Sequence, residues 1–359
     1  MRSVTRPSQE LLRSISDEHV LRSLMTSRRL TRAELAVVTG LSKPTVSESV
    51  RRLVESGLVA DTGERTPGGR GKGRVGSFYG LAPDVGVALV VTIAPDGVTA
   101  LCVDAHGDVV SQTHRAIAGP RDVASVLPSV AAETVAGQHV RLCAVSAADP
   151  VDRRTGRLVQ LPDSPFLVGD LDPVAVLAPL LHGPVVVDND VNWAAQAELG
   201  VLGVPDFAYL YLAEGLGCAV VSDGEVRRGH SGLAGEISHL ITSGPSGAVP
   251  FIEVFGELGL RQSGTTAIDV DALLRTDPAV LARAVAGVVT ALVTLADPEV
   301  VVVGGSWGPA LLDPIRDECA RLPRQVSVTA ASVAEPSLAG ARAAALDLLR
   351  TALVEAAKA

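Results

Sequence analysis

Cysteines, aromatic residues and long apolar segments are all scarce in this sequence. The four cysteines, Cys102, Cys143, Cys218 and Cys319, are dispersed and none forms a CxxC pair, which argues against a disulfide framework and against a thiolate zinc site. Only 3% of the residues are aromatic, so few rings could stack on a ligand. The longest uncharged apolar run, residues 284–296, is shorter than the roughly 20 residues that span a bilayer.

The N-terminus, MRSVTRPSQELL, is polar and shows no signal-peptide pattern. We therefore expect a cytoplasmic protein with no membrane association. The chain has 359 residues, of which 47% are hydrophobic and 20% charged, so it can bury more than one hydrophobic core, and two or three domains are expected.

Positive charge is concentrated at the N-terminal end. The net charge is −9, yet residues 1–81 carry 14 Lys and Arg against 8 Asp and Glu, whereas residues 82–359 carry 17 against 32. A basic segment beside an acidic one is typical of a nucleic-acid-binding domain attached to a body with another role. We expect a DNA-binding domain over residues 1–81 and a ligand-sensing and dimerisation domain over residues 82–359.

The basic segment predicts a helix-turn-helix. Apolar residues recur at helical spacing from Val20, and the stretch LTRAELAVVTGLSKPTVSESVRRLVESGLV predicts two further helices with a tight break between them. Thr31 and Glu34 fit a capping box, Gly40 fits a helix end, and Ser42 fits the cap of the next helix. That last helix is the expected recognition helix.

A wing is predicted to follow it. Residues 57–81, GLVADTGERTPGGRGKGRVGSFYGL, suggest two short strands around a basic, glycine-rich loop that could enter a minor groove. On the helix, exposed polar residues can reach base edges and the arginines suit phosphates. The expected DNA contacts are Lys43, Pro44, Thr45, Ser47, Glu48, Arg51 and Arg52 on the helix and Arg70, Lys72 and Arg74 in the wing. The alternative is an ordinary three-helix unit with solvated charges and a flexible loop.

Beyond residue 81, valine-rich strands alternate with Ala- and Leu-rich helices, which indicates an α/β body whose strands are largely covered on both faces. One strand, VVVDND at 185–190, ends in Asn189 and Asp190 before a helical stretch. Two polar residues at such a place could present a catalytic base or could simply cap the helix.

Three segments together resemble one family. VVVDND, then EGLGCAVVSDGEVRRGHSGLAGEISHL at 214–240, then DPEVVVVGGS at 297–306 are similar in order and spacing to the ROK family of sugar kinases and sugar-responsive repressors. The resemblance covers essentially the whole chain, and the winged head indicates the transcriptional regulators of the xylose and N-acetylglucosamine repressor type. It implies two ribonuclease-H-like lobes of the actin and hexokinase type, with a sugar in the cleft between them.

The resemblance also implies roles for individual residues. Asp190 stands at the position of the kinase general base. The positions that match residues holding sugar hydroxyls are Asn189, Asp190, Glu236, His239 and Glu253. Carboxylates, an amide and an imidazole suit a ring of hydroxyls, which both donate and accept hydrogen bonds. The alternatives are a helix cap for Asn189 or Asp190 and a surface pair for Glu236 and His239.

The residues that would hold ATP phosphates have changed. Where family kinases have an Asp-x-Gly-Gly-Thr loop, residues 90–100 read VVTIAPDGVTA, and Ala213-Glu214-Gly215 replaces a Gly-Thr-Gly turn. Phosphoryl transfer depends on a phosphate-cradling backbone and a metal, and a carboxylate repels phosphate. Gly304 and Gly305 remain, but a Gly-Gly after a strand can equally be a tight turn. We expect no productive ATP binding, no catalytic residue and no cofactor.

Two further family features are missing. The family zinc site combines the His of Glu-x-x-His with three cysteines, and residues 240–256 contain none, so no metal is expected. A Gly-x-Pro-Gly turn near the sugar is replaced by residues 146–149, Ser-Ala-Ala-Asp, which leaves the identity of the ligand open.

The sequence thus predicts a homodimeric transcriptional regulator, a repressor, that binds double-stranded operator DNA and senses a sugar or sugar derivative. The dimer could pair further into a tetramer. Two alternatives stay open: an active ROK sugar kinase with an appended DNA-binding head, and a DNA-binding regulator that responds to no ligand.

Overall fold

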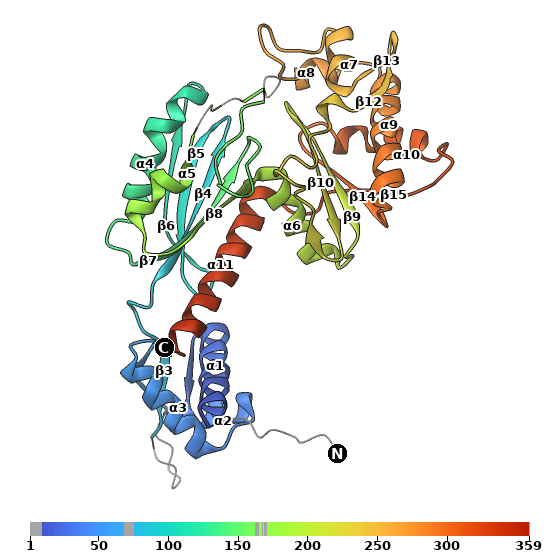
Figure 1. The fold of residues 1–359 in the computed structure, drawn as a ribbon. Helices are drawn as coiled ribbons and strands as arrows, with labels where there is room; N and C mark the ends of the chain where they lie inside the picture. The colour runs from blue at the N-terminus through green and yellow to red at the C-terminus, as the bar shows by residue number, and fades with distance from the viewer. Residues whose placement is uncertain (1–8, 68–74, 162–164, 167, 169–170, 359) are drawn as a thin grey trace.

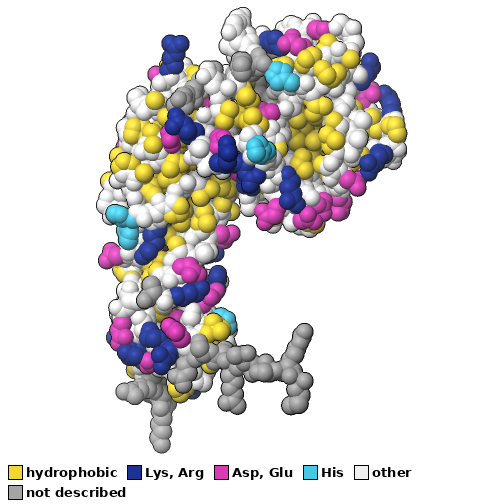
Figure 2. All heavy atoms as spheres, in the orientation of Figure 1, with side chains coloured by type: hydrophobic (Ala, Val, Ile, Leu, Met, Phe, Trp, Pro, Cys, Tyr) yellow, Lys and Arg dark blue, Asp and Glu magenta, His cyan; other side chains and the backbone are white. Residues whose placement is uncertain are grey.

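The computed structural model describes residues 9–67, 75–161, 165, 166, 168 and 171–358. A small head lies at one end of the molecule, two lobes lie side by side at the other, and the C-terminal helix runs from the first lobe to the head (Figure 1). The space-filling view shows a deep notch between the head and the second lobe (Figure 2).

The head packs helices against a small antiparallel sheet of order β1-β3-β2. Its elements are α1 (Gln9–Ser27), β1 (Arg29–Thr31), α2 (Arg32–Thr39), α3 (Lys43–Glu55), β2 (Val59–Arg65) and β3 (Ser77–Leu81). β2 and β3 are the two strands expected to flank the wing. β3 ends at Leu81, where the sequence predicts the head to end.

The capping residues expected from the sequence are confirmed. Thr31 Oγ1 accepts a hydrogen bond from Glu34 N, and the Glu34 carboxylate accepts one from Thr31 N at 2.7 Å. Gly40 ends α2 in the left-handed region with φ of 70°, a conformation that favours glycine. Ser42 Oγ accepts from Thr45 N at 3.3 Å and begins α3. These local signals fix where the two helices of the motif start and stop.

The first lobe is built on a sheet of order β6-β5-β4-β7-β8, in which β4, β7 and β8 are parallel. Its elements are β4 (Val87–Ala94), β5 (Gly97–Val103), β6 (Val109–Ala116), η1 (Pro120–Asp122), α4 (Val123–Thr134), β7 (Val140–Ala147), α5 (Pro173–Leu177), η2 (Ala178–Leu180) and β8 (Val185–Asn189). Leu89 and Val91 face α4, whereas Ala88 and Val90 face the C-terminal helix α11 (Pro336–Ala356). Both faces are covered, which is why the strand is continuously apolar.

The second lobe has a sheet of order β11-β10-β9-β14-β15. Its elements are α6 (Asp190–Leu202), β9 (Phe207–Leu212), β10 (Leu216–Ser222), β11 (Glu225–Val226), η3 (Ile237–His239), β12 (Ile241–Gly244), β13 (Gly247–Pro250), α7 (Phe251–Glu257), α8 (Val270–Leu273), α9 (Pro278–Ala296), β14 (Val300–Gly304), η4 (Pro309–Leu311), α10 (Leu312–Cys319) and β15 (Ser327–Ala330). Buried residues of α7, α9 and α10 pack on one face, and buried residues of α6 on the other.

Helix α9 is long and apolar enough, by length and composition, to cross a membrane, and half of that stretch is buried. Leu281, Val285 and Val289 are fully buried in the core of the second lobe. Packing inside the lobe therefore accounts for the apolar composition of this helix.

One hydrophobic cluster joins the head to the first lobe. α11 contributes Ala341 and Ala345 beside the sheet, and Leu353 joins the same cluster as Leu21 and Leu24 of α1. The head and body are thus consecutive in the sequence, but they share a core through the last helix of the chain.

Polar contacts hold the same junction. Arg28, at the end of α1, forms a 2.6 Å ion pair with Asp108 in the β5–β6 turn. His106 Nδ1 of that turn lies 2.9 Å from the Met25 carbonyl oxygen. On the other side of the turn, Arg342 of α11 donates to the Gly107 carbonyl. The turn is therefore clamped between the head and α11.

Candidate functional site

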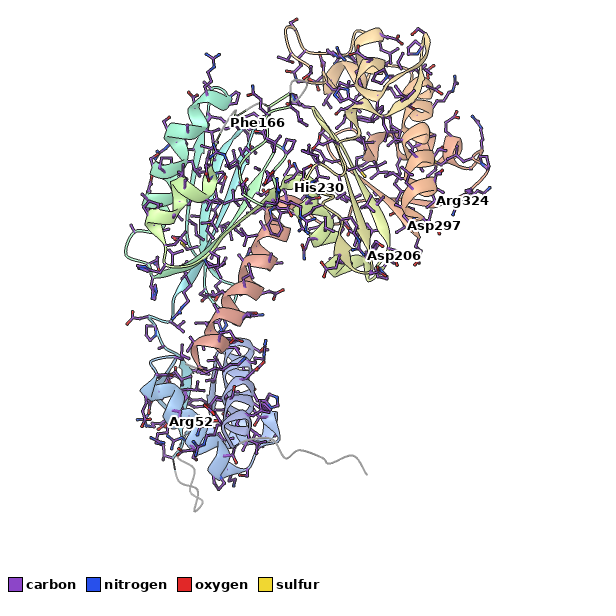
Figure 3. All side chains as sticks on the ribbon, viewed as in Figure 1. Arg52, Phe166, Asp206, His230, Asp297 and Arg324 are labelled. Atoms are coloured by element: carbon purple, nitrogen blue, oxygen red, sulfur yellow. The ribbon has the colours of Figure 1, made fainter. Side chains whose placement is uncertain are left out.

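A pocket of about 370 Å³ lies between the two lobes, with walls from both. It sits beyond the carboxyl ends of β7, β8 and β9, the edge at which α/β sheets usually bind ligands. Phe166 forms part of its wall and is labelled in Figure 3. The polar residues that line the pocket are Asn189, Asp190, Asn192, Tyr211, Glu214, Glu236, Ser238, His239 and Ser306.

Asn189 caps α6 and holds the loop after β7. Its Oδ1 accepts from Val191 N at 2.9 Å, and its Nδ2 donates to the carbonyl oxygens of Ala147 at 3.4 Å and Asp149 at 3.3 Å. The helix-cap interpretation is therefore confirmed for this residue. Asn189 also lies on the pocket wall, where its contact with a sugar stays a prediction.

Asp190 is the first residue of α6 and lines the pocket. Burial raises the pKa of its carboxyl group to about 7; a hydrogen bond from Val191 N–H partly opposes this, and the charges of Glu236 and Asp149 add to it. A carboxyl group that titrates near neutrality beside other carboxylates is typical of functional sites.

Glu236 lies just before η3 and is exposed to the open pocket. The surrounding protein nevertheless removes enough water to raise the pKa of this carboxyl group to about 7, and the charge of Asp149 adds to the effect. Asp190 and Glu236 therefore face the same space, and each makes ionisation of the other less favourable.

Asp149 is the residue that the sequence analysis did not assign to the site. It is 1% exposed, follows β7, and accepts a hydrogen bond from Val168 N at 3.2 Å. Its neighbours Ala148 and Pro150 line the pocket. A polar residue after a buried strand, at the sheet edge that also carries Asn189, was the available signal.

Asp188 anchors the pocket wall from behind. This buried carboxylate accepts from Arg228 Nε at 2.6 Å and from Asn192 Nδ2 at 2.7 Å. The ion pair joins β8 of the first lobe to the loop after β11 in the second. The negative charge of Asp188 neutralises the positive charge of Arg228 behind the pocket wall.

The five residues that the resemblance assigns to the sugar are not all together. His239 lies on η3 and lines the pocket with Asn189, Asp190 and Glu236. Glu253 is not among the lining residues, although its neighbour Ile252 is. The Glu253 carboxylate instead accepts from Arg261 Nη2 at 3.0 Å on the surface of α7, so the structure places it apart from the other four.

The turn that would face a phosphate carries a carboxylate. Glu214 lies between β9 and β10, exposed on the pocket. Gly305, after β14, has φ of 89°, and a Cβ there would overlap the Leu212 carbonyl oxygen. Close packing alone thus requires this glycine, in agreement with the tight-turn interpretation.

No group of three or more His, Cys, Asp or Glu side chains in the described part of the chain is arranged to hold a metal ion. A second cavity, of about 470 Å³, shares Asp190, Val191 and Tyr211 with the first and reaches the start of α11 at Pro336 and Ser337. The first residues of α6 therefore lie between the pocket and α11.

Helices α6 and α11 are joined tightly. The Glu198 carboxylate of α6, 1% exposed, accepts hydrogen bonds from the backbone N–H groups of Ser332 at 2.7 Å and Val333 at 2.8 Å, just before α11. A Cβ on Gly340 would overlap the Trp193 carbonyl oxygen, so the two backbones approach closely. Movement at the start of α6 would therefore be passed to α11.

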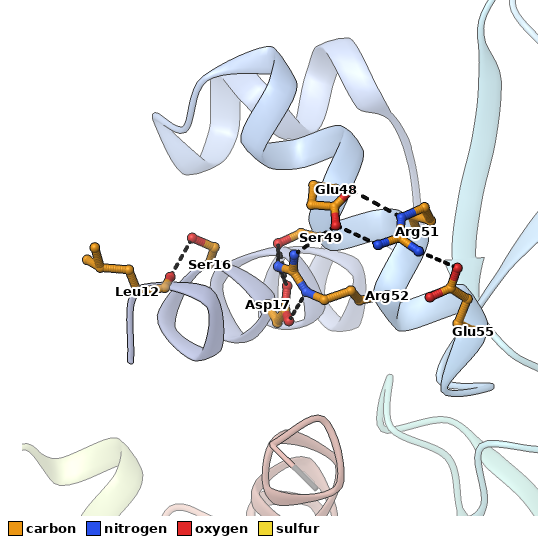
Figure 4. A network of polar contacts seen from close by, with 8 residues as sticks. All are labelled: Leu12, Ser16, Asp17, Glu48, Ser49, Arg51, Arg52 and Glu55. Atoms are coloured by element: carbon orange, nitrogen blue, oxygen red, sulfur yellow. Dashed lines mark hydrogen bonds and ion pairs between the residues drawn. The ribbon is translucent and has the colours of Figure 1, made fainter. Parts of the chain in front are cut away.

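The candidate DNA-contacting residues of α3 fall into two groups. Lys43, Pro44, Glu48 and Arg51 are exposed, and Thr45 and Ser47 are half-buried. Arg51 pairs with Glu48 at 2.6 Å and with Glu55 at 2.5 Å (Figure 4). The wing residues Arg70, Lys72 and Arg74 lie outside the described residues.

Arg52 has a different role from the one its sequence position suggests. It donates through Nε and Nη2 to both carboxylate oxygens of Asp17, at 2.9 and 2.6 Å (Figure 4). Asp17 is buried in α1 and also accepts a hydrogen bond from Ser49. Arg52 therefore holds α3 against α1, and its donors are engaged within the head rather than aimed at a phosphate.

Comparisons with known proteins agree with this architecture. The profile of the ROK family matches residues 96–252, and a winged helix-turn-helix DNA-binding profile matches residues 13–60. The xylose repressor of Bacillus spizizenii is 22% identical over 246 residues, which span 65% of this chain and 62% of the repressor. The alignment thus leaves more than a third of that repressor unmatched.

Solved structures show the same fold. A ROK family transcriptional regulator, a homologue of the E. coli Mlc protein, superposes with a TM-score of 0.59 at 20% identity, covering 96% of this chain and 99% of that one. A ROK family glucokinase from Streptomyces griseus, in complex with glucose and AMPPNP, gives 0.54 at 24% identity over 72% of this chain and 99% of the kinase. The two-lobed body has the same fold as this glucokinase, and the regulator matches the fold of the head as well. The chain therefore combines a ROK family domain with an N-terminal winged helix-turn-helix.

Proposed function

We propose that the protein is a sugar-responsive transcriptional regulator, a repressor, that binds double-stranded operator DNA through its head. In this proposal the body binds a sugar or sugar derivative between its lobes and does not phosphorylate it. The winged helix-turn-helix match and the similarity to xylose repressors support the DNA-binding half. The inter-lobe pocket, with Asn189, Asp190, Glu236 and His239 on its walls, supports the sensing half. We place this activity in the cytoplasm.

The observation that carries the proposal is the continuous connection from pocket to head. α6 begins at Asp190 in the pocket, Glu198 ties α6 to the start of α11, and the last turns of α11 share a core with α1. A ligand that changes the angle between the lobes would therefore change the position of the head. It can do so only if it binds the two arrangements with different affinity.

Two features argue against phosphoryl transfer as the main activity. Glu214 places a negative charge on the turn at which the family resemblance predicts a phosphate. Pro95, in the β4–β5 hairpin, stands in the loop that in family kinases reads Asp-x-Gly-Gly-Thr. Because catalysis of phosphoryl transfer depends on positioning the phosphates, we expect no sugar-dependent ATP turnover.

The regulator is expected to act as a homodimer, which could pair further into a tetramer. One head reads a single half-site, and two heads related by a two-fold axis would read half-sites about one helical turn apart. Ligand-dependent movement of α11 would change the spacing of the two recognition helices.

The test combines DNA selection with a ligand panel. Genomic fragments that bind the purified full chain are isolated, and their affinity is measured by fluorescence anisotropy at fixed salt, with and without pentoses, hexoses, N-acetylhexosamines and sugar phosphates. ADP formation is followed in parallel with ATP and Mg²⁺. The matched control is Asp190→Ala, which removes the carboxyl group from the pocket.

We expect one sugar class to weaken DNA binding of the wild type, no such response in Asp190→Ala, and no ADP. Sugar-dependent ADP formation would identify a kinase with an appended head. DNA binding that no sugar alters, with no thermal stabilisation by any of them, would identify a ligand-independent regulator. A ligand at 100 times its Kd should stabilise the fold by about 2.7 kcal/mol, so binding is readily detected.

A further inference from the structure

The part of the pocket wall that carries Glu236 and His239 is a short segment held at both of its ends. At the first end, the Gly235 carbonyl oxygen accepts a hydrogen bond from Cys218 N of β10 at 3.0 Å. At the other end, β12 begins at Ile241, directly after the short helix η3. The position of these two side chains therefore depends on what fixes β12.

The β12–β13 hairpin returns the chain to the same pocket. Its two strands pair along their length, and at its base Phe251 N donates to the Leu240 carbonyl oxygen at 2.8 Å. Ile252 follows the hairpin and lines the pocket, as His239 does before it. A shift of the hairpin would therefore displace the pocket wall at two places.

Thr242 fixes this hairpin to helix α9, beside which it lies (Figure 1). The residue is 6% exposed, and its Oγ1 donates to the Ala284 carbonyl oxygen at 2.6 Å. A Cβ on Gly287 would overlap Thr242 Oγ1, so the strand and the helix approach closely. Because α9 is packed in the core of the second lobe, it gives the hairpin a fixed support.

A second contact, at the tip of the hairpin, is weaker. Ser246 donates to the Glu257 carboxylate of α7 through its backbone N–H at 3.2 Å and also through Oγ. Both residues are exposed, so water competes for these hydrogen bonds. Thr242 is buried and also lies nearer to His239 along the chain, so its contact controls the position of the pocket wall more directly.

The 2.6 Å distance between Thr242 Oγ1 and the Ala284 carbonyl oxygen requires a hydroxyl donor. A methyl group in its place would need about 3.3 Å from the same oxygen, so valine, although similar in shape, should push β12 away from α9. Groups that bind a ligand must be held within about 0.5 Å of their productive positions. A displacement of this size at η3 should weaken the hydrogen bonds proposed between the sugar and Glu236 and His239.

We propose that Thr242 is a positioning residue for the sugar pocket, which acts through the β12–β13 hairpin on Glu236 and His239. The inference rests on the proposed function, because it concerns sugar affinity at the same pocket. Thr242 is not among the residues that line the pocket, so its effect on affinity is indirect. Its hydroxyl group sets the distance between β12 and α9, and that distance sets the position of the two side chains.

The experiment measures sugar affinity and stability separately on the full-length protein. D-Xylose, L-arabinose, D-glucose, D-mannose, D-galactose and N-acetyl-D-glucosamine are titrated into the wild type by calorimetry, and the sugar that binds most tightly is used for the variants. Thr242→Val removes the hydroxyl group, Thr242→Ser keeps it, and Gly287→Ala displaces it from the side of α9. Urea unfolding gives the stability of each variant.

Two controls distinguish positioning from a general loss of stability. Ile315→Val shortens a fully buried side chain of α10 in the same hydrophobic core, so it destabilises the second lobe without changing the hairpin contact. Ser246→Ala removes the hydroxyl contact at the exposed tip of the hairpin. Both should bind the sugar within about twofold of the wild type.

We expect Thr242→Val to weaken sugar binding about tenfold, comparable with the loss of one well-formed hydrogen bond. Thr242→Ser should bind like the wild type. Gly287→Ala should also weaken binding, although alanine favours the helix, because Thr242 must then rotate or the hairpin must move.

Wild-type affinity in Thr242→Val would overturn the inference and leave the proposed function standing. An equal loss of affinity in Ile315→Val would show that binding follows stability, which would also overturn it. If Thr242→Val fails to fold, Gly287→Ala tests the same contact, and wild-type affinity in that variant would be the contrary result. If none of the sugars binds the wild type, the proposed function is overturned together with the inference.

Discussion

Glu198 of α6 accepts two hydrogen bonds from Ser332, from the backbone N–H at 2.7 Å and from Oγ at 2.9 Å. A carboxylate that is 1% exposed is tolerated only because these donors, with Val333 N–H, replace water. This contact joins the helix that starts in the pocket to the helix that ends in the head.

The contact between Glu198 and Ser332 should therefore contribute both to the stability of the protein and to the effect that sugar binding has on DNA affinity. Glu198→Gln can keep its amide oxygen on the two backbone N–H donors, but it loses the carboxylate charge and no longer accepts from Ser332 Oγ, so we expect it to lower the free energy of unfolding by about 1 to 2 kcal/mol. Sugar should still bind this variant, but its effect on DNA affinity should decrease. Urea denaturation and the ligand-dependent anisotropy assay measure the two effects.

Ser332→Ala is the matched control, because it removes only the bond from Oγ and keeps both backbone donors. It should lose less stability, about 1 kcal/mol, and retain the response to sugar. If Glu198→Gln has the stability of the wild type and its DNA affinity responds to sugar as the wild type does, the role assigned to this contact is wrong.

The Asp190 carboxyl group should make stability depend on pH. Its pKa is raised to about 7 in the folded state, against roughly 4 in an unfolded chain. Between these values the unfolded chain loses its proton while the folded one keeps it, so the free energy of unfolding falls as pH rises from about 4 to about 7. Asp190→Asn removes this loss. It should be more stable than the wild type at pH 8 by about 1 to 2 kcal/mol, allowing for partial exposure to solvent.

Urea unfolding of both proteins from pH 5 to pH 8 provides the measurement. The difference in free energy of unfolding between the two proteins reports on the Asp190 carboxyl group alone, because all other titrating groups are the same in both. This difference should become smaller toward pH 5. A difference that does not change with pH would mean that Asp190 is ionised throughout that range.

Substitutions of Arg52 and Lys43 should have different effects, because Arg52 stabilises the packing of α3 and Lys43 is a candidate DNA contact. Arg52→Ala leaves the Asp17 carboxylate, whose side chain is 7% exposed, without its cationic partner. We expect a loss of about 2 to 3 kcal/mol of stability, somewhat below the range for fully buried pairs because Arg52 is partly exposed. Thermal unfolding would detect it, and an unchanged Tm would exclude a stabilising role for the pair.

Lys43→Ala should behave in the opposite way. Lys43 is exposed at the start of α3, so its removal should leave Tm unchanged. If it contacts a phosphate, DNA binding should weaken about equally for all sequences, and the slope of log Kd against log salt should fall by about one. Unchanged affinity and slope would remove Lys43 from the interface.

Gly235 should be essential to the pocket loop. It has φ of 99°, and a Cβ would overlap the Cys218 carbonyl oxygen, so Gly235→Ala should lower stability by more than about 2 kcal/mol and abolish sugar binding. Gly224 also has positive φ, 74°, but no atom lies within 4 Å of its Cβ position. Gly224→Ala should therefore cost only the backbone strain, about 1 kcal/mol, and keep ligand binding. Equal effects of the two substitutions in thermal unfolding and sugar titration would refute this difference.

Local signals were readable from the sequence because they depend on neighbouring residues. The capping box at Thr31, the left-handed Gly40 and the Ser42 cap are each decided within a few residues of the chain. The alternation of apolar strands and helices predicted the α/β body for the same reason, whereas its two lobes were implied by the resemblance to the ROK family. Sequence position also brought Asn189 and Asp190 to the end of a strand, and so to the edge where ligands bind.

Other roles depended on distant partners. Arg52 looked like a phosphate contact until Asp17, 35 positions away, was found to hold it. Glu253 shares the local chemistry of the other acidic site residues, but Arg261 holds it outside the pocket. Asn189 caps α6 through its side chain and also lines the pocket, where its contact with a sugar stays a prediction.

The sequence by itself determined many of the helices and strands, with their caps, and placed Asn189 and Asp190 at the end of a strand, because these follow from periodicity and short-range hydrogen bonding. Only the tertiary structure decided which charges meet. It placed Asp149 behind Asp190 and Glu236 and brought the last turns of α11 back to α1. Burial and Coulomb interactions act through space rather than along the chain, so the charge of the pocket and its connection to the head were set by folding.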